Sequence, residues 1–201
     1  ETLRDEALSW TDANEAKRAF FNWKKAGSTF ESALPAGEWF DGRIEPDEVD
    51  VPGEITLAVD IPPDRSAAFI AWAGFGPDGT VHAELDAVEI LDPLEAPDRL
   101  LEIMSNPANG ISVVHLNPTG GAGSLVKLLR RLGVEVHALT AREMAQACGL
   151  VTYLVKARKL THCEAPELGD AVANGERRAL GPDGSFAWAQ QDRRGATVSP
   201  L

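Results

Sequence analysis

Asp60 is the residue whose type and position first suggest chemistry. It closes an apolar stretch in which Ile55, Leu57 and Val59 alternate with smaller side chains, as in a strand whose successive residues face opposite ways. Pro62 follows shortly, and proline cannot extend a central strand because it lacks a backbone donor. Asp60 is therefore either a functional carboxylate or an aspartate that caps a turn.

Two further apolar runs follow Asp60 and supply the elements that would position it. They cover residues 67–73 and 80–91, and short segments rich in glycine, proline and aspartate precede each of them. Three strands joined by short turns predict an antiparallel meander. We expect Asp60 near the middle of the sheet if a later strand flanks the first one on its other side.

Helices and strands alternate in the second half of the chain. The expected elements are a helix at 96–105, a strand at 111–116, a helix at 122–132, a strand at 134–139 and a helix at 140–159. Thr140 and Glu143 have the spacing of a capping box at the start of the last helix. This order after three antiparallel strands predicts an α/β fold with a mixed sheet and helices packed on it.

The two ends of the chain are less regular. Residues 1–26 have the periodicity of a helix, and residues 27–53 predict an irregular connector that Trp39 and Phe40 attach to an apolar surface. Near the other end we expect a helix at 166–178 and a strand at 185–189. We expect the chain to be the rear part of a longer polypeptide, cut just before a further helix.

The composition limits the class of protein. The chain has 201 residues, 44% of them hydrophobic and 25% charged, which is typical of one globular domain with an appendage. No window has the apolar length of a membrane span, and the start lacks a secretory signal pattern, so we expect a cytoplasmic protein and no membrane partner. Cys148 and Cys163 have no zinc-site spacing and are expected to be reduced thiols.

The net charge of −12 is unevenly distributed. Residues 1–100 hold 8 Lys and Arg against 22 Asp and Glu, or −14, whereas residues 101–201 hold 11 against 9, or +2. The acidic half should repel phosphate. The second half carries short basic groups that are either solvated helix faces or local DNA contacts. The DNA-binding candidates among them are Lys127, Arg130, Arg131, Arg177 and Arg178.

Several segments together resemble a known family. They are LAVDIPPDRSAAFIAWAG, VVHLNPTGGAGSLVKLLRRLGVEV, LTHCEAPELGDAVANGERRALG and the closing ATVSPL, with EAKRAFFNWKKAG and LPAGEW upstream. In order and spacing they resemble the C-terminal nuclease domain of the large terminase subunit of tailed phages, from about Ala16 onward. The resemblance implies a ribonuclease H-like fold and a metal-dependent endonuclease that cuts concatemeric double-stranded DNA during packaging in an infected bacterial host.

The resemblance also implies an active site of carboxylates that hold two divalent ions, Mg²⁺ or Mn²⁺, which stabilise the entering and leaving oxygens of the phosphodiester. Asp60 matches the first carboxylate. The positions of the other two are occupied by Asn117 and Thr197, which are neutral. Because charged ligands interact strongly with a nearby dication, their absence should weaken the metal site by several kcal/mol.

Three explanations of this departure remain open: Asn117 is an engineered substitution, the native chain is a weakened or inactive nuclease, or another carboxylate substitutes. The alternative ligands by element order are Asp64, Asp86 and Asp170, of which the first suits a turn and the last a helix surface. His162 matches a histidine of the family and has either a structural role or a contact with DNA phosphate.

The resemblance divides the chain into a linker and helical segment from an upstream ATPase domain, residues 1–53, and a ribonuclease H-like nuclease domain, residues 54–201. Two functions follow. The first is an endonuclease domain of the packaging motor. The second is a catalytically silent module that docks on DNA or on protein partners such as the portal or the small terminase subunit. Another nuclease of the same fold class is a third, weaker hypothesis.

Overall fold

The computed structural model describes residues 34–86, 91–163, 165–180 and 185–188. The predicted first helix and Thr197 lie outside these residues. A sheet of six strands, in the order β5-β4-β1-β2-β3-β6, forms the centre of the described part. Its strands are β1 (Thr56–Asp60), β2 (Phe69–Phe75), β3 (Val81–Leu85), β4 (Val113–Leu116), β5 (Glu135–Ala138) and β6 (Leu160–Thr161).

The predicted meander and mixed sheet are confirmed. Strands β1, β2 and β3 pair antiparallel in chain order, whereas β4 pairs parallel with β1, β5 with β4 and β6 with β3. Strand β1 thus lies between β4 and β2, so the strand that carries Asp60 is central, as its apolar pattern predicts. This is the mixed sheet of a ribonuclease H-like fold.

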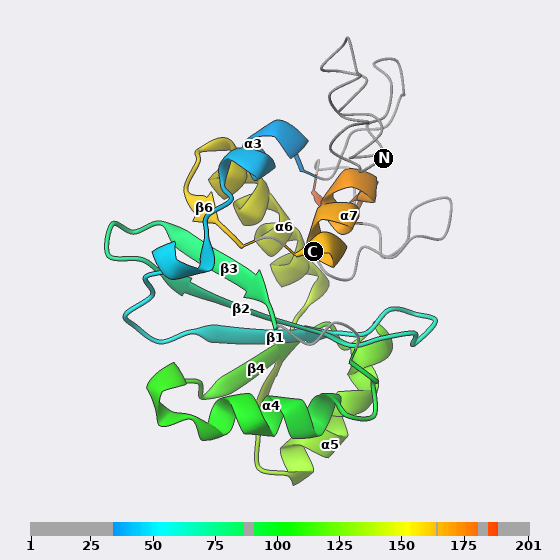
Figure 1. Cartoon of the computed structure of the whole chain (residues 1–201). Coiled ribbons are helices and arrows are strands. Elements are labelled where there is room, and N and C mark those ends of the chain that lie inside the picture. The colour runs from blue at the N-terminus through cyan, green and yellow to red at the C-terminus, as the bar shows by residue number, and fades with distance from the viewer. Residues whose placement is uncertain (1–33, 87–90, 164, 181–184, 189–201) are drawn as a thin grey trace, which may run out of the picture.

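Helices cover both faces of the sheet (Figure 1). Helices α4 (Ala96–Ser105) and α5 (Leu125–Arg131) lie on one face, and α3 (Ala36–Asp41), α6 (Ala141–Lys156) and α7 (Pro166–Asn174) lie on the other. Short 3-10 helices occur at η1 (Pro46–Glu48), η2 (Pro107–Asn109) and η3 (Gly121–Ser124). A separate hairpin of β7 (Arg177–Ala179) and β8 (Phe186–Trp188) follows α7.

Each helix layer encloses its own apolar core, because successive strand residues alternate between the two faces. Leu57 and Val59 of β1 face the α4 and α5 layer, where they pack with the fully buried Leu100 and Leu129. The opposite core joins Leu34, which precedes α3, to side chains of the other helix layer and β6: Trp39, Val155, Leu160, Leu168 and Val172. The two cores hold the sheet between them and fix the ends of its strands.

Two sequence predictions are wrong in detail. The segment 27–53 is not wholly irregular, because α3 and η1 form within it and Trp39 is buried against the ring of His162. The helix predicted at 166–178 ends at Asn174, and Arg177 and Arg178 belong to a strand. Both errors arise where tertiary packing or hairpin pairing decides the local structure.

Among the described residues, no helix combines the length and apolar character needed to cross a membrane.

Candidate active site

Asp60 and Asn117 lie at the carboxyl ends of neighbouring parallel strands. Strands β1 and β4 pair so that Val59 is opposite Leu116. Asp60 follows Val59, and Asn117 follows Leu116. Strands paired in this way are about 4.8 Å apart. The structure therefore brings these two residues together, although 56 positions separate them along the chain.

The loops that follow these strands are in direct contact. Gly121, in the loop after β4, approaches the backbone of the loop after β1 so closely that an added Cβ would lie 2.5 Å from the Ile61 carbonyl oxygen and 2.8 Å from that of Pro62. Ile61 and Pro62 are themselves buried. A larger residue would force the loops apart, so Gly121 fixes the separation of the two strand ends.

The two polar side chains differ in what they offer to a cation. Asp60 is half-buried, and its Oδ1 atom is shielded from solvent. The Oδ1 atom of Asn117 accepts hydrogen bonds from the Thr119 backbone N–H at 3.1 Å and from the Thr119 hydroxyl at 2.7 Å. An aspartate at this position would retain a second oxygen for a metal, whereas asparagine has an amide NH₂ there, which only donates.

The described residues therefore do not fit a site for two divalent ions. Such a site needs several anionic oxygen ligands. Asp60 supplies one carboxylate, and the only oxygen of the Asn117 side chain already accepts two hydrogen bonds. The third expected position, Thr197, lies outside the described residues.

Asp86 lies at the same edge of the sheet as Asp60 but is engaged by an arginine. It follows β3, which runs parallel to β1 two strands away, at about 10 Å. Arg99 of α4 donates to both carboxylate oxygens of Asp86 at 2.7 Å. This fork, together with Glu102, raises the pKa of Arg99, so the guanidinium stays charged and neutralises Asp86.

The other two carboxylates lie in a turn and on a helix. Asp64 is exposed in the turn after β1, where hydrogen bonds from the Ser66 backbone and hydroxyl lower the pKa of its carboxyl group. Asp170 is exposed on α7, in the helix layer that packs around Trp39. The structure therefore gives Asp64 the environment of a turn residue and places Asp170 on the surface of a helix.

His162 is buried inside the fold. Its ring stacks on Trp39 with 3.9 Å between centroids, and its Nε2 and Nδ1 atoms lie 2.9 Å and 3.0 Å from the carbonyl oxygens of Trp39 and Cys163. With 4% of its surface exposed, the residue holds α3 onto the sheet edge and has no surface for a DNA phosphate.

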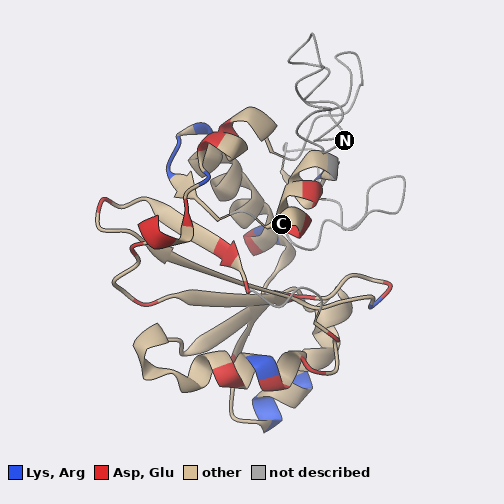
Figure 2. Ribbon diagram, in the orientation of Figure 1, with Lys and Arg blue, Asp and Glu red and all other residues tan. Residues whose placement is uncertain are grey.

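The basic candidates lie on two separate elements, α5 and β7. Lys127, Arg130 and Arg131 are exposed on α5, in the layer below the sheet in Figure 2. Because α5 connects the carboxyl end of β4 to the amino end of β5, its last turn, with both arginines, points away from the Asp60 edge. Arg177 and Arg178 lie on β7, where the Arg177 guanidinium stacks 4.5 Å from the centre of the Phe186 ring.

Sequence reasoning missed a pair of histidines near Asp60. His115 is opposite Ala58 on β1 and His137 on β5, so these side chains share one face of the sheet, and the two rings lie 5.2 Å apart. Burial, and then the charge of His137, lower the pKa of His115, so it is a neutral base at physiological pH. The signal was available, since His115 stands two positions before Asn117 and would share its face in an extended strand.

Glu143 links this histidine pair to the start of α6. Its carboxylate is 3.0 Å from His137 Nε2 and accepts hydrogen bonds from the Thr140 N–H and hydroxyl, which confirms the predicted capping box. The bonds from Thr140, followed by the one from His137, lower the pKa of Glu143 to about 2. Glu143 therefore stays a carboxylate near neutral pH and contacts His137, while His115 is the neutral base on the face beside Asp60.

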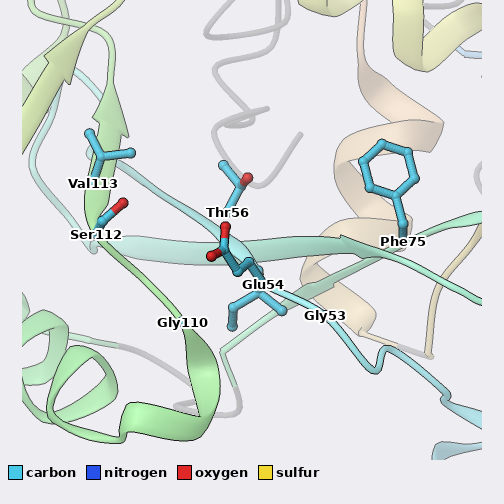
Figure 3. A pocket seen from close by; sticks show the side chains of 8 residues that line it. Gly53, Glu54, Thr56, Phe75, Gly110, Ser112 and Val113 are labelled. Atoms are coloured by element: carbon cyan, nitrogen blue, oxygen red, sulfur yellow. The ribbon is translucent and has the colours of Figure 1, made fainter.

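A cavity of about 470 Å³ lies at the opposite end of the same strands. Figure 3 shows its polar side chains, Glu54, Thr56 and Ser112, near the amino ends of β1 and β4. Asp60 and Asn117 are at the carboxyl ends, so this cavity is separate from the candidate active site.

The solved structures that are similar to this fold include two from phage terminases. The HK97 bacteriophage large terminase matches 100% of the chain with a TM-score of 0.63 and 12% sequence identity. A mutant nuclease domain of the large terminase subunit of bacterial virus Sf6, solved with manganese and beta-thujaplicinol, matches 85% of the chain with a TM-score of 0.53 and 11% identity. The chain covers 94% of the Sf6 domain but only 48% of the HK97 protein.

These matches show the fold, and they confirm the resemblance to phage terminase nuclease domains at that level. Neither known protein families nor curated protein sequences match the chain.

Proposed function

We propose that this chain is the nuclease domain of a phage DNA-packaging terminase and that Asp60 marks its catalytic pocket. The observation that carries the proposal is the convergence of Asp60 and Asn117 at adjacent strand ends in a fold shared with terminase nuclease domains. The substrate is double-stranded DNA, and the reaction is hydrolysis of its phosphodiester bonds.

A bound Mg²⁺ or Mn²⁺ ion would supply charge stabilisation to the scissile phosphate, and Asp60 is the described residue that would hold it. The described residues do not fit two such ions, because the Asn117 side-chain oxygen already accepts two hydrogen bonds. The chain's own contribution is positional. Gly121 holds the two strand ends together, and His115 is a neutral base on the face beside them. We expect weak hydrolysis by the chain as it stands.

Nicking of supercoiled plasmid in Mn²⁺ tests this function. We expect little nicking by the unmodified chain and clear nicking by Asn117→Asp, because the new carboxylate keeps the turn with Thr119 and frees one oxygen. Asn106→Asp is a matched control. Asn106 also accepts a backbone hydrogen bond two residues on, from Ala108 at 3.1 Å, but it lies at the end of α4.

Absence of nicking by both the unmodified chain and Asn117→Asp would contradict the nuclease proposal. If Asn106→Asp increased plasmid nicking as much as Asn117→Asp, the increase would come from the added negative charge itself and not from its position beside Asp60.

The second candidate function is a silent module of the packaging motor. It is favoured by the Asn117 amide, whose oxygen accepts two local hydrogen bonds and so is not presented to a cation. In that case the acidic first half, with a charge of −14 over residues 1–100, would face a protein partner such as an upstream ATPase domain, the portal or the small terminase subunit. This second function would be supported if the unmodified chain and Asn117→Asp both bound DNA and neither nicked it.

A further inference from the structure

His82, Glu84 and Cys163 form a cluster of ligand-type side chains away from Asp60. His82 and Glu84 alternate on β3 and therefore share one face. Strand β6 pairs parallel with β3, with His82 opposite Thr161, so Cys163 follows two residues later on the same side. One donor atom from each of the three residues lies within 4.8 Å of the other two.

The His82 ring is held on both of its nitrogens. Nδ1 lies 3.0 Å from the Thr161 hydroxyl, and Nε2 lies 2.8 Å from Glu84 Oε1. The residue is 3% exposed, and the Trp72 ring is 5.3 Å from it. Ligating histidines usually have one ring nitrogen oriented by a neighbouring polar group while the other binds the metal. Thr161 occupies the position of that orienting group.

Glu84 is the centre of the cluster. Its Oε1 atom lies 2.8 Å from Nε2 of His82, and the Cys163 Sγ atom lies within 4.8 Å of the ligand atoms of both residues. A cation among these atoms would gain one nitrogen, one oxygen and one sulfur ligand, and it would release protons on binding.

We propose that His82, Glu84 and Cys163 bind a single thiophilic divalent cation of the zinc class. Zinc accepts sulfur, nitrogen and carboxylate oxygen together, and the ligands of a tetrahedral zinc site with one sulfur lie about 3.3 to 3.6 Å from one another. The widest pair in the cluster must therefore close by at most about 1.3 Å, and the His82 Nε2 and Glu84 Oε1 atoms, which are 2.8 Å apart, must open by about 0.5 Å. Three protein ligands leave a fourth position open to water or to a ligand of the cation.

This site is distinct from the edge that holds Asp60 in both place and chemistry. It lies between β3 and β6, on the far side of β2 from β1. The thiol favours a soft or borderline cation over Mg²⁺, whereas the oxygen atoms at Asp60 favour hard cations. The alternative is a hydrogen-bond network that holds β6 onto β3 without any metal.

Titration of the metal-free, reduced chain with Zn²⁺ against a chromogenic chelator separates these possibilities. Cys163→Ala and Cys148→Ala form a matched pair, since Cys148 is a buried thiol on α6 outside the cluster. We expect one Zn²⁺ per chain and unchanged affinity in Cys148→Ala. Loss of a direct ligand in Cys163→Ala should weaken binding by more than about 100-fold, and loss of the orienting hydroxyl in Thr161→Val by about 10- to 100-fold.

Cobalt gives an independent readout of the ligands. The Co²⁺ complex of the unmodified chain should show a thiolate-to-metal charge-transfer band that Cys163→Ala lacks. If circular dichroism shows that Cys163→Ala is unfolded, Glu84→Gln tests the same site, because its amide keeps one oxygen for a hydrogen bond. Asp60→Asn should bind Zn²⁺ normally, which separates this proposal from the nuclease function.

No Zn²⁺ binding by the unmodified chain, or unchanged binding in both Cys163→Ala and Thr161→Val, would overturn the proposed site.

Discussion

The edge of the sheet at Asp60 and the cluster at His82 are opposite cases of how a fold supports chemistry. At the edge, the backbone brings two strand ends together, but one of the two side chains is neutral and its oxygen is engaged by Thr119. Between β3 and β6, three different ligand types converge at a place for which the family resemblance implies no function. A shared fold therefore indicates where a site can form, whereas individual side chains decide which ligand it accepts.

The largest expected effect tests the edge. In the Asn117→Asp background, Asp60→Asn removes the only other described carboxylate at these strand ends. A unit charge 4 Å from a cation contributes about 4 kcal/mol at an effective dielectric near 20, or about 10³ in rate. Plasmid nicking should therefore fall by about that factor. Nicking that survives in the double variant would show that the carboxylates which matter lie elsewhere.

The next effect contrasts the two sites through stability. A ligand that binds only the folded chain, present at 100 times its Kd, raises the free energy of unfolding by about 2.7 kcal/mol, which is about 5 to 10 °C in Tm for a chain of this size. Thermal unfolding monitored by circular dichroism should show this rise with Zn²⁺. Millimolar Mg²⁺ should leave the Tm of the unmodified chain unchanged, and an equal rise with both cations would remove the distinction between the sites.

A smaller effect concerns the contact between the two loops at the edge. Gly121→Ala places a Cβ against the carbonyl oxygens of Ile61 and Pro62, and such overpacking costs about 1 to 3 kcal/mol. Denaturant unfolding should show this loss, and Mn²⁺ nicking by Asn117→Asp should fall with it. Gly149→Ala is the control, because a Cβ at that helical position meets nothing within 4 Å. A control as unstable as Gly121→Ala would contradict the assigned role.

The smallest effect concerns the helix that begins beside His137. Thr140→Ala removes the cap of α6 and should lower the free energy of unfolding by about 1 kcal/mol at neutral pH. The pKa of Glu143 falls from 4.5 to about 2 in the folded chain, chiefly because of Thr140. Its contribution is therefore present above about pH 4.5 and is lost as the pH falls towards 2, so the difference between wild type and variant should shrink over that range. A difference independent of pH would contradict the role of the carboxylate.

Periodic segments were predictable because local patterns determine them. The helix at 96–105 matches α4, and the apolar run that ends at Asp60 matches β1. Helix α3 was missed because its stability comes from Trp39 stacking on His162, more than 120 positions away. The overlong helix at 166–178 reflects the pairing of β7 with β8, which no helical periodicity reveals.

The candidate sites were also predictable to different degrees, because some of their residues follow local patterns and others depend on long-range pairing. A strand ending in a carboxylate is visible in a sequence, so Asp60 was found from the apolar run before it, whereas position 117 was singled out by the family resemblance. The alternation of His82 and Glu84 was also visible, but Cys163 joins them only through the parallel pairing of β3 with β6. The hydrogen bonds from Thr119 to the Asn117 oxygen could not be predicted from the sequence, because they depend on the conformation of the turn that the two residues form.

Calorimetric titration of Mn²⁺ into the unmodified chain, Asn117→Asp and Asn106→Asp tests the central claim, that the missing charge at position 117 limits the metal site. Even after solvent screening, a new carboxylate beside a cation should contribute at least about 2 kcal/mol, or about 30-fold in affinity. We therefore predict that Asn117→Asp binds Mn²⁺ at least about 30-fold more tightly than the other two chains. Equal affinity in all three would contradict the account.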